Sequence, residues 1–286
     1  MNVVFTCGGT GGYACFPALM AGAMMKIPTC VHESNAMPGL TTRILAPSVD
    51  KVLVCFAESI QHYKKSVAKK IEVVGMPVRR EFVYTKKDDA RAELQLDEKP
   101  LVISAFGSQG ASEMNKLVVE LFRLEKEAGF PFRHIHAAGN WAMEWMPNMV
   151  KEKGIDLAVD TDIQLVEYLY NMPTVMAASD VMISRAGAST CNEIAAAGKP
   201  SILIPSPNVS DNHQEKNARA LSDRGGAVLL LEKDATPEKL LQLILDLLAD
   251  KERYSNMRSV LQSFSVPDSA ERLCDIMEEL AKKNAR

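Results

Sequence analysis

The sequence predicts an α/β protein with two Rossmann-like domains, each built on a parallel sheet. Short apolar runs alternate with helical stretches along the chain, and such runs are typical of strands that are covered on both faces of a parallel sheet. At about 150 residues per domain, a chain of 286 residues makes roughly two domains. Two of the runs lead into glycine-rich turns that open a helix, as in nucleotide-binding α/β folds.

The first domain is predicted over residues 1–84. Its strands are the apolar runs at residues 3–6, 27–32, 51–55 and 71–74, and a helix over residues 17–25 follows the first strand. Residues 85–99 are charged and hold Lys86-Lys87-Asp88-Asp89, so we interpret them as a linker between the domains.

The apolar pattern restarts at Pro100, and the second domain is predicted over residues 100–265. Thr236 is expected to cap the helix over residues 236–249, with Pro237 at its first position. The expected strands lie at residues 101–105, 132–137, 181–184, 201–204 and 227–231, and the other expected helices at residues 112–128, 172–178, 189–197 and 213–223.

The last segment, residues 266–286, is predicted to be a terminal helix that packs back on the first domain. The helix is expected over residues 268–283. Its apolar stripe has helical spacing and consists of Leu273, Ile276, Met277 and Leu280.

Composition and charge exclude several classes of protein. The net charge of −3 argues against a dedicated nucleic-acid binder, which normally has a strong basic excess. Six cysteines form no CxxC pair, so we expect free thiols in a reducing compartment. His134 and His136 alternate on one strand without a third ligand nearby, so we expect no metal site. The longest apolar stretch, about ten residues at positions 16–25, is too short for a spanning helix, which needs about 20. We therefore expect a cytosolic protein, and contact with a membrane surface stays open.

Three strand-to-helix turns carry small residues that let backbone N–H groups approach a phosphate: residues 8–12, 107–111 and 184–193. The alternative for each is a tight structural turn. Glu193 follows the third turn by about one helical turn, where a carboxylate can hold both hydroxyls of a ribose. The alternative is that Glu193 binds no ligand and is a first-turn glutamate favoured by the helix dipole.

Two polar segments follow strands. Gln214, within residues 211–218, suits sugar hydroxyls, although an ordinary helix start capped by Asp211 or Asn212 fits that pattern better. The segment His32-Glu33-Ser34-Asn35 comes at the carboxyl end of a strand, where open sheets bind ligands.

Together these segments resemble the MurG-type glycosyltransferases of peptidoglycan synthesis, and the resemblance covers the chain from Val3 onward. The matching motifs, in order, are Gly9-Thr10-Gly11-Gly12-Tyr13, His32-Glu33-Ser34-Asn35-Ala36-Met37-Pro38-Gly39-Leu40, Gly75-Met76-Pro77-Val78-Arg79, Gly107-Ser108-Gln109-Gly110-Ala111, Ser184-Arg185-Ala186-Gly187, Glu193-Ile194-Ala195-Ala196-Ala197-Gly198 and Asp211-Asn212-His213-Gln214. Each motif alone is weak, but the ordered set is specific.

The resemblance implies a GT-B fold and an inverting, metal-free and cofactor-free transfer of N-acetylglucosamine from its UDP donor. The implied acceptor is undecaprenyl-pyrophosphoryl-MurNAc-pentapeptide. The backbone of Leu169 would meet the uracil and Glu193 would hold the ribose. The diphosphate would be served by Arg79, Ser108 and the stretch Ala188, Ser189, Thr190, Cys191 and Asn192. The sugar would be bound by Asn35 and Gln214, and the donor site would be closed by Thr10, Gly11 and Gly12.

The chain also departs from the family pattern. The family has two glycine-rich loops in its first domain, and this chain has one, ending in Tyr13, so we expect an incomplete first domain. If the chain is the whole protein, donor binding should survive and transfer should be weak or absent. Tyr13 cannot replace the family's proposed histidine base at neutral pH because a tyrosine pKa is near 10. His32 is then the weak remaining candidate.

Two other functions stay open: a UDP-GlcNAc 2-epimerase, and a non-catalytic nucleotide-sugar-binding module that works beside a partner. A truncated gene is a third explanation of the short first domain. Since the implied acceptor is lipid-linked, we expect a peripheral protein on the cytoplasmic side of the cell membrane. The candidate patch consists of Phe16, Met20, Met24 and Met25, with Lys26, Lys64, Lys65, Lys69 and Lys70 nearby in sequence. Plain helix core is the alternative for the four apolar residues.

Overall fold

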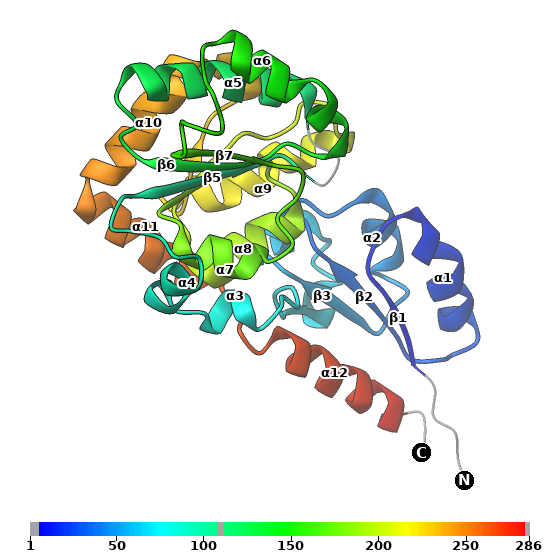
Figure 1. Ribbon diagram of the computed structural model, residues 1–286. Coiled ribbons are helices and arrows are strands. Elements are labelled where there is room, and N and C mark those ends of the chain that lie inside the picture. Colours follow the sequence, from blue (N-terminus) through cyan, green and yellow to red (C-terminus); the bar gives the residue numbers. More distant parts are fainter. Residues whose placement is uncertain (1–5, 108–110, 284–286) are drawn as a thin grey trace.

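The computed structural model describes residues 6–107 and 111–283, and it contains two parallel sheets (Figure 1). The first sheet has the strand order β1-β2-β3-β4, and the second has the order β10-β9-β8-β5-β6-β7. Every strand pair in both sheets is parallel. The α/β fold expected from the alternating pattern is therefore confirmed.

The first sheet consists of β1 (Cys7–Gly9), β2 (Thr29–Glu33), β3 (Lys51–Val54) and β4 (Ile71–Val73). Its helices are η1 (Tyr13–Cys15), α1 (Phe16–Met24), α2 (Leu40–Leu45), η2 (Ala57–His62) and η3 (Ala68–Lys70). The first strand forms at residues 7–9, because Cys7 pairs with Thr29 and Gly9 with Val31. Most of the strand expected at residues 3–6 lies outside the described residues. A Cβ at Gly9 would lie 2.7 Å from Leu19 Cδ1, so only glycine lets α1 pack this closely on β1.

The second sheet consists of β5 (Leu101–Ala105), β6 (Arg133–Ala137), β7 (Ile163–Val166), β8 (Val181–Ser184), β9 (Ser201–Leu203) and β10 (Val228–Leu229). Its helices are α5 (Ser112–Glu127), η4 (Asn140–Glu144), α6 (Met146–Glu152), α7 (Met172–Ala178), α8 (Ala188–Ala197), η5 (Ser210–Asn212), α9 (His213–Ser222), η6 (Glu232–Asp234), α10 (Pro237–Ala249) and α11 (Lys251–Phe264). The Thr236 hydroxyl accepts from the Lys239 N–H, which confirms it as the cap of α10.

The charged segment after the first domain is folded. It contains α4 (Lys87–Glu93), which follows α3 (Glu81–Tyr84). Ala90 is fully buried, and Arg91 donates to the carbonyl of Ala178 at 3.1 Å and to that of Lys99 at 2.7 Å. Because these bonds fix α4 beside α7, the segment covers the second sheet rather than hanging free as a linker.

The last helix, α12 (Ser269–Lys283), lies against the first sheet (Figure 1). Leu280 is buried with Cys30, Leu53 and Val74, and three further residues pack there: Leu273, Ile276 and Met277. The chain thus crosses between the sheets twice, and the crossings touch, since a Cβ at Gly75 would lie 2.7 Å from Val266 Cβ. No described helix is long and apolar enough to cross a membrane.

A chain of buried polar side chains lies between α5 and the second sheet. Ser104 Oγ lies 2.7 Å from His134 Nε2 and 2.6 Å from His136 Nδ1. His134 Nδ1 lies 2.7 Å from the carboxyl of Glu125, and His136 Nε2 lies 3.2 Å from Asn115 Oδ1. None of the five is more than 1 % exposed, so their bonds replace water and fix α5 on the sheet.

Candidate functional site

The strand order of the second sheet places a crevice at its carboxyl edge. β6 and β7 extend from β5 in one direction and β8, β9 and β10 in the other, so the order reverses between β5 and β8. Open α/β sheets bind ligands at such a switch point. A cavity of about 180 Å³ opens there, and its lining residues are Arg79, Ala105, Gly107, Ala137, Glu167, Tyr168, Leu169, Met172, Met182, Thr190 and Glu193. It is smaller than the roughly 300–1,000 Å³ usual for a whole small-molecule ligand, so it suits one end of a longer ligand.

Three charged residues line this cavity: Glu193, Glu167 and Arg79. Glu193 lies on α8, is half-buried, and has its pKa raised by burial while the positive charge of Arg79 acts in the opposite direction. Arg79 comes from the segment after β4, and its guanidinium lies 5.3 Å from the ring centre of Phe82. Glu193 and Arg79 therefore bring a carboxylate and a guanidinium from different domains to one cavity, which Glu167 and several apolar side chains also line.

The residues at the start of α8 differ in whether a ligand can reach them. Thr190 lines the cavity and Ser189 is exposed, whereas Cys191 is fully buried in the core. Burial raises the pKa of Cys191 to about 12, and its N–H donates to the carbonyl of Gly187 at 2.9 Å. Asn192 donates its side-chain amide to the carbonyl of Ala188 at 2.8 Å. Cys191 thus offers a ligand neither its side chain nor its N–H, which corrects its place among the expected lining residues.

Asn217 joins the two sheets, and sequence reasoning did not assign it a role. Its Oδ1 accepts from the N–H of Ala36 at 2.9 Å, and its Nδ2 donates to Asn35 Oδ1 at 3.1 Å and to the carbonyl of Ala186 at 3.2 Å. The polarity of residues 211–218 is visible in the sequence. Only the fold shows that Asn217 is fully buried at this junction.

Replacing Asn217 with alanine is expected to lower the free energy of unfolding by about 1–3 kcal/mol, because the buried N–H of Ala36 loses its acceptor. Urea unfolding measures this change. The matched control is Asn148→Ala, since Asn148 is exposed on α6 and we expect less than about 0.5 kcal/mol there. Equal unfolding free energies for wild type and Asn217→Ala would show that the junction contributes nothing.

The other expected sugar-binding groups also have partners. Asn35 donates its amide to Glu33 Oε1 at 3.1 Å, and Gln214 Oε1 accepts from the N–H of Ser206 at 2.9 Å. Gln214 lies in the first turn of α9, the helix that carries Asn217. These bonds fix the orientation of the Asn35 amide and leave it one N–H with which to donate to a sugar hydroxyl.

The glycine loop of the first domain lies beside β2. Gly11 and Gly12 have φ values of 77° and 74°, which favour glycine, and Thr10 beside them is exposed. A Cβ at Gly11 would lie 3.5 Å from the carbonyl oxygen of His32. Ser108 lies outside the described residues.

His32 is held by two strands and a turn. Its Nε2 lies 2.8 Å from the Gly75 carbonyl, to which it donates, and 3.4 Å from Cys55 Sγ. Burial lowers its pKa, so the neutral ring is favoured. With Nε2 committed to a carbonyl, the ring supports the start of the segment that leads to Arg79, and its role as a base stays a prediction.

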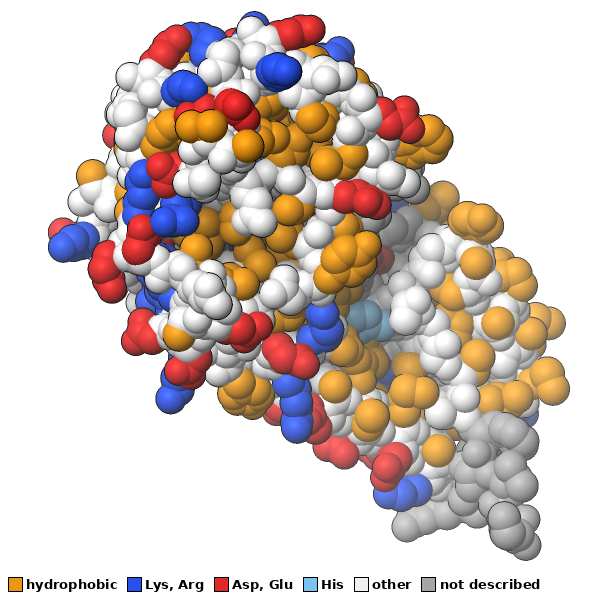
Figure 2. Space-filling model, in the orientation of Figure 1, with side chains coloured by type: hydrophobic (Ala, Val, Ile, Leu, Met, Phe, Trp, Pro, Cys, Tyr) orange, Lys and Arg blue, Asp and Glu red, His pale blue; other side chains and the backbone are white. Residues whose placement is uncertain are grey.

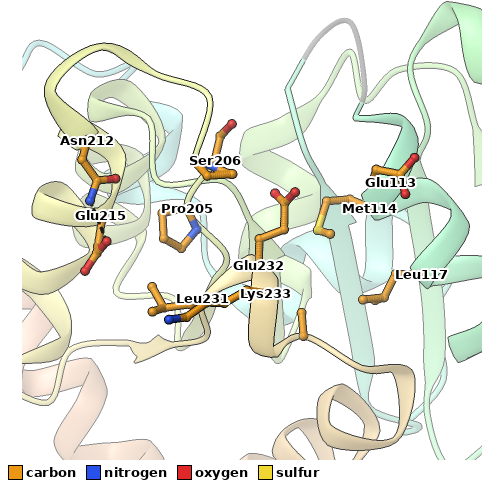
Figure 3. Close-up of a pocket in the computed structure, with 12 residues that line it drawn as sticks. Glu113, Met114, Leu117, Pro205, Ser206, Asn212, Glu215, Leu231, Glu232 and Lys233 are labelled. Carbon is orange, nitrogen blue, oxygen red and sulfur yellow. Dashed lines mark hydrogen bonds between the residues drawn. The ribbon is translucent and has the colours of Figure 1, made fainter.

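A larger cavity, about 660 Å³, lies between α5, α9 and the segment after β10 (Figure 3). Three carboxylates line it, those of Glu113, Glu215 and Glu232, against one lysine, Lys233. Each of these carboxylates pairs with a cation: Glu113 with Lys116, Glu215 with Arg219 and Glu232 with Arg185. The smaller cavity beside Arg79 is the better donor site despite its size, because it lies at the switch point of the second sheet. The described residues hold no group of three or more His, Cys, Asp or Glu placed to bind a metal ion.

Comparisons with known proteins show the family to which the chain belongs. Residues 4–54 match the glycosyltransferase family 28 N-terminal domain, and residues 102–273 match its C-terminal domain. A Caldanaerobacter subterraneus protein named UDP-N-acetylglucosamine–N-acetylmuramyl-(pentapeptide) pyrophosphoryl-undecaprenol N-acetylglucosamine transferase is 42% identical over 273 residues, which cover 95% of this chain and 73% of that protein. A Bacillus cereus protein of the same name, numbered 1, is 39% identical over 277 residues, which cover 96% of this chain and 73% of that protein.

Solved structures share the fold. The crystal structure of Acinetobacter baumannii MurG matches with a TM-score of 0.76 at 24% identity, covering 95% of this chain and 74% of that one. The UDP-GlcNAc 2-epimerase of Neisseria meningitidis matches with a TM-score of 0.64 at 14% identity, covering 96% of this chain and 76% of that one. The fold by itself therefore does not separate a transferase from an epimerase.

Proposed function

Because the chain belongs to the UDP-N-acetylglucosamine–N-acetylmuramyl-(pentapeptide) pyrophosphoryl-undecaprenol N-acetylglucosamine transferases, we propose that it transfers N-acetylglucosamine from UDP to that lipid-linked acceptor. The observation that carries the proposal is the identity of 42% along 95% of the chain. The cavity beside Arg79 and Glu193 agrees with it, since a half-buried carboxylate and a guanidinium suit a ribose and a diphosphate.

In the proposed complex the uracil enters the cavity against the backbone of Leu169. Glu193 accepts hydrogen bonds from the ribose hydroxyls. The diphosphate lies between Arg79 and the start of α8, where helix N–H groups and the helix dipole attract negative charge. Gln214 and Asn35 hold the sugar, and the loop of Thr10, Gly11 and Gly12 closes over it.

The reaction is an inverting substitution at C1 of the sugar. The acceptor hydroxyl forms a new C–O bond on one face while the bond to UDP breaks on the other. The electron pair leaves with the diphosphate, whose growing negative charge Arg79 stabilises. The hydroxyl proton passes to a base that the residues in this cavity do not identify.

A radiolabel assay tests the proposal. With labelled UDP-N-acetylglucosamine and the undecaprenyl-linked acceptor, we expect labelled lipid product, and we expect Arg79→Ala to slow its formation. Conversion of UDP-N-acetylglucosamine without acceptor would instead favour the epimerase. Donor binding with neither reaction would favour the non-catalytic module, and absence of binding would refute all three functions.

We also infer that the protein binds the cytoplasmic side of the membrane through the end of the first domain. An apolar patch around α1 and α2 is exposed there, and it consists of Tyr13, Met24, Met25, Leu40 and Ile44. Figure 2 shows hydrophobic side chains over the outer face of this domain. Phe16 and Met20 pack against the core, so of the four residues expected in the patch only Met24 and Met25 are exposed. Lys70 is engaged with the carbonyls of Pro47 and Val49.

Replacing Met24 and Met25 with serine is expected to weaken binding to anionic phospholipid vesicles about tenfold, because two thioether side chains no longer enter the lipid. Vesicle co-sedimentation measures the change. Exposed Val159, on the second domain, provides the control variant Val159→Ser, which should bind as wild type does. Equal loss in both variants, or no binding by wild type, would count against this surface.

A further inference from the structure

A second polar cavity, of about 370 Å³, lies where the chain enters and leaves the second domain. Residues 82–87 form one wall, the end of α8 at residues 196–199 forms another, and α11 contributes Tyr254, Arg258 and Gln262. The helices that surround it gather on one side of the second sheet (Figure 1). It shares no lining residue with the cavity that holds Arg79 and Glu193.

Four cationic residues line this cavity, and no acidic residue does: Lys86, Lys87, Lys199 and Arg258. Asp180, a carboxylate that acts on the lining residues Lys199 and Tyr254, is already engaged. It pairs with Lys87 and with Arg91, and it accepts from the N–H of Leu101 at 2.8 Å. Within residues 6–107 and 111–283, the side chains of Lys86 and Arg258 make no ion pair or hydrogen bond. The cavity therefore keeps two exposed, unneutralised cations.

The surroundings of Lys199 show that the electrostatic potential in this region is positive. It is buried, and its ammonium donates to the carbonyls of Ser179 and Ala177 at the end of α7. Burial is the main cause that lowers its pKa to about 7, and the positive charges of Lys87, Arg258 and Arg91 add to it, while Asp180 acts in the opposite direction. A bound anion would reduce the repulsion between these positive charges. The Lys199 ammonium itself already donates its hydrogen bonds to the two carbonyls.

We propose that this cavity binds a phosphorylated small molecule at a site separate from the donor site. The guanidinium of Arg258 takes two phosphate oxygens in its planar fork, and Lys86 neutralises a third from the opposite wall. Tyr84, 66% exposed on the same wall, offers an aromatic face to whatever the phosphate carries. The volume exceeds that of a bare ion and lies at the lower end of small-molecule sites.

The position of the site gives it a measurable consequence. Residues 82–87 continue from the first crossing between the sheets, and Gln262 lies in the last turn of α11, which leads into the second crossing at Val266. A ligand that joins these two walls binds the folded chain only. Its binding must therefore raise the stability of the protein in a concentration-dependent way.

Titration calorimetry with inorganic pyrophosphate tests the site, at constant ionic strength and with saturating UDP to occupy the donor site. We expect saturable binding that weakens at least tenfold in the double variant Lys86→Gln, Arg258→Gln. The control is Lys251→Gln, because Lys251 begins α11 and is exposed outside the cavity. The affinity of the double variant for UDP checks that it is folded and is expected to match that of wild type.

Absence of saturable pyrophosphate binding in wild type would overturn the site, as would equal binding by wild type and the double variant. A result in which binding falls in Arg79→Ala but not in the double variant would assign the pyrophosphate to the donor site and refute this one. Failure of UDP to bind would contradict the proposed function alone, since the dependence on Lys86 and Arg258 is measured separately.

Discussion

Replacing Glu193 with alanine is expected to weaken the binding of UDP-N-acetylglucosamine about 100-fold, equivalent to about 2.7 kcal/mol. The variant loses an ionised acceptor that holds two ribose hydroxyls inside a largely apolar cavity, where hydrogen bonds to a charged group contribute most. It also leaves Arg79 without the opposite charge that it faces across the cavity. Titration calorimetry with the intact chain measures the loss.

A donor analogue that lacks the ribose 2′-hydroxyl makes this test specific. Wild type should bind the analogue more weakly than the natural donor, whereas Glu193→Ala should bind both alike, because the group that distinguishes them is gone. Glu238→Ala, on the exposed first turn of α10, is the matched control and should bind as wild type does. If Glu193→Ala still discriminated between the two donors, the ribose would have to be held elsewhere.

Replacing Glu125 with alanine is expected to lower the free energy of unfolding by about 3–5 kcal/mol, since it removes one member of a fully buried pair and leaves a cavity. Replacement with glutamine should lower the free energy of unfolding much less, because a glutamine amide can make the same hydrogen bond to His134.

The donors and acceptors of the network explain why. Asn115 Nδ2 donates to the Ala138 carbonyl, so Asn115 Oδ1 must accept from His136 Nε2.

The remaining donors and acceptors of this network then follow in order. His136 Nδ1 accepts from Ser104, so Ser104 Oγ accepts from His134 Nε2. His134 is then neutral only if Nδ1 accepts from Glu125, which requires either a protonated carboxyl or an amide. Burial raises the pKa of Glu125, in the direction of that protonated form. A glutamine amide supplies the same donor without a shared proton.

Urea unfolding of both variants tests this assignment. Glu127→Ala is the control, because Glu127 lies on the same helix, is largely exposed and should change the stability by less than about 0.5 kcal/mol. If Glu125→Gln were as unstable as Glu125→Ala, the pair would depend on the negative charge of the carboxylate. The order of donors and acceptors would then be wrong.

Much of the second domain could be predicted from the sequence. The bounds expected for β5, β8 and α7 match the structure, because buried apolar runs between polar residues leave few alternatives. The prediction missed β7, the seven-residue helix α6, and α11. β7 is a short edge strand with an exposed glutamine in it, and α11 buries only Met257 and Leu261 among mostly polar residues. Local patterns are weak where an element is half exposed.

The candidate site, like the fold, could be predicted from the sequence only in part. Local motifs pointed to Thr190 and Glu193, because strand-to-helix turns with small residues mark the carboxyl edge of a sheet. Leu169, which lines the same cavity, was implied only by the family resemblance. The same motifs included Cys191, whose side chain the fold turns into the core. A turn specifies which residues are near a ligand, but the rotation of the helix that follows decides which side chains point toward it.

The sequence by itself determined the family and most of the strands and helices, and it predicted which turns lie at the carboxyl edge of the second sheet. Only the tertiary structure decided which distant residues meet. Asn35 and Asn217, 182 positions apart, bond across the two sheets, and Arg79 reaches Glu193 from a segment after β4. Local propensity acts over a few residues, whereas these contacts depend on how whole sheets pack. The packing satisfies buried polar groups that no local pattern can pair.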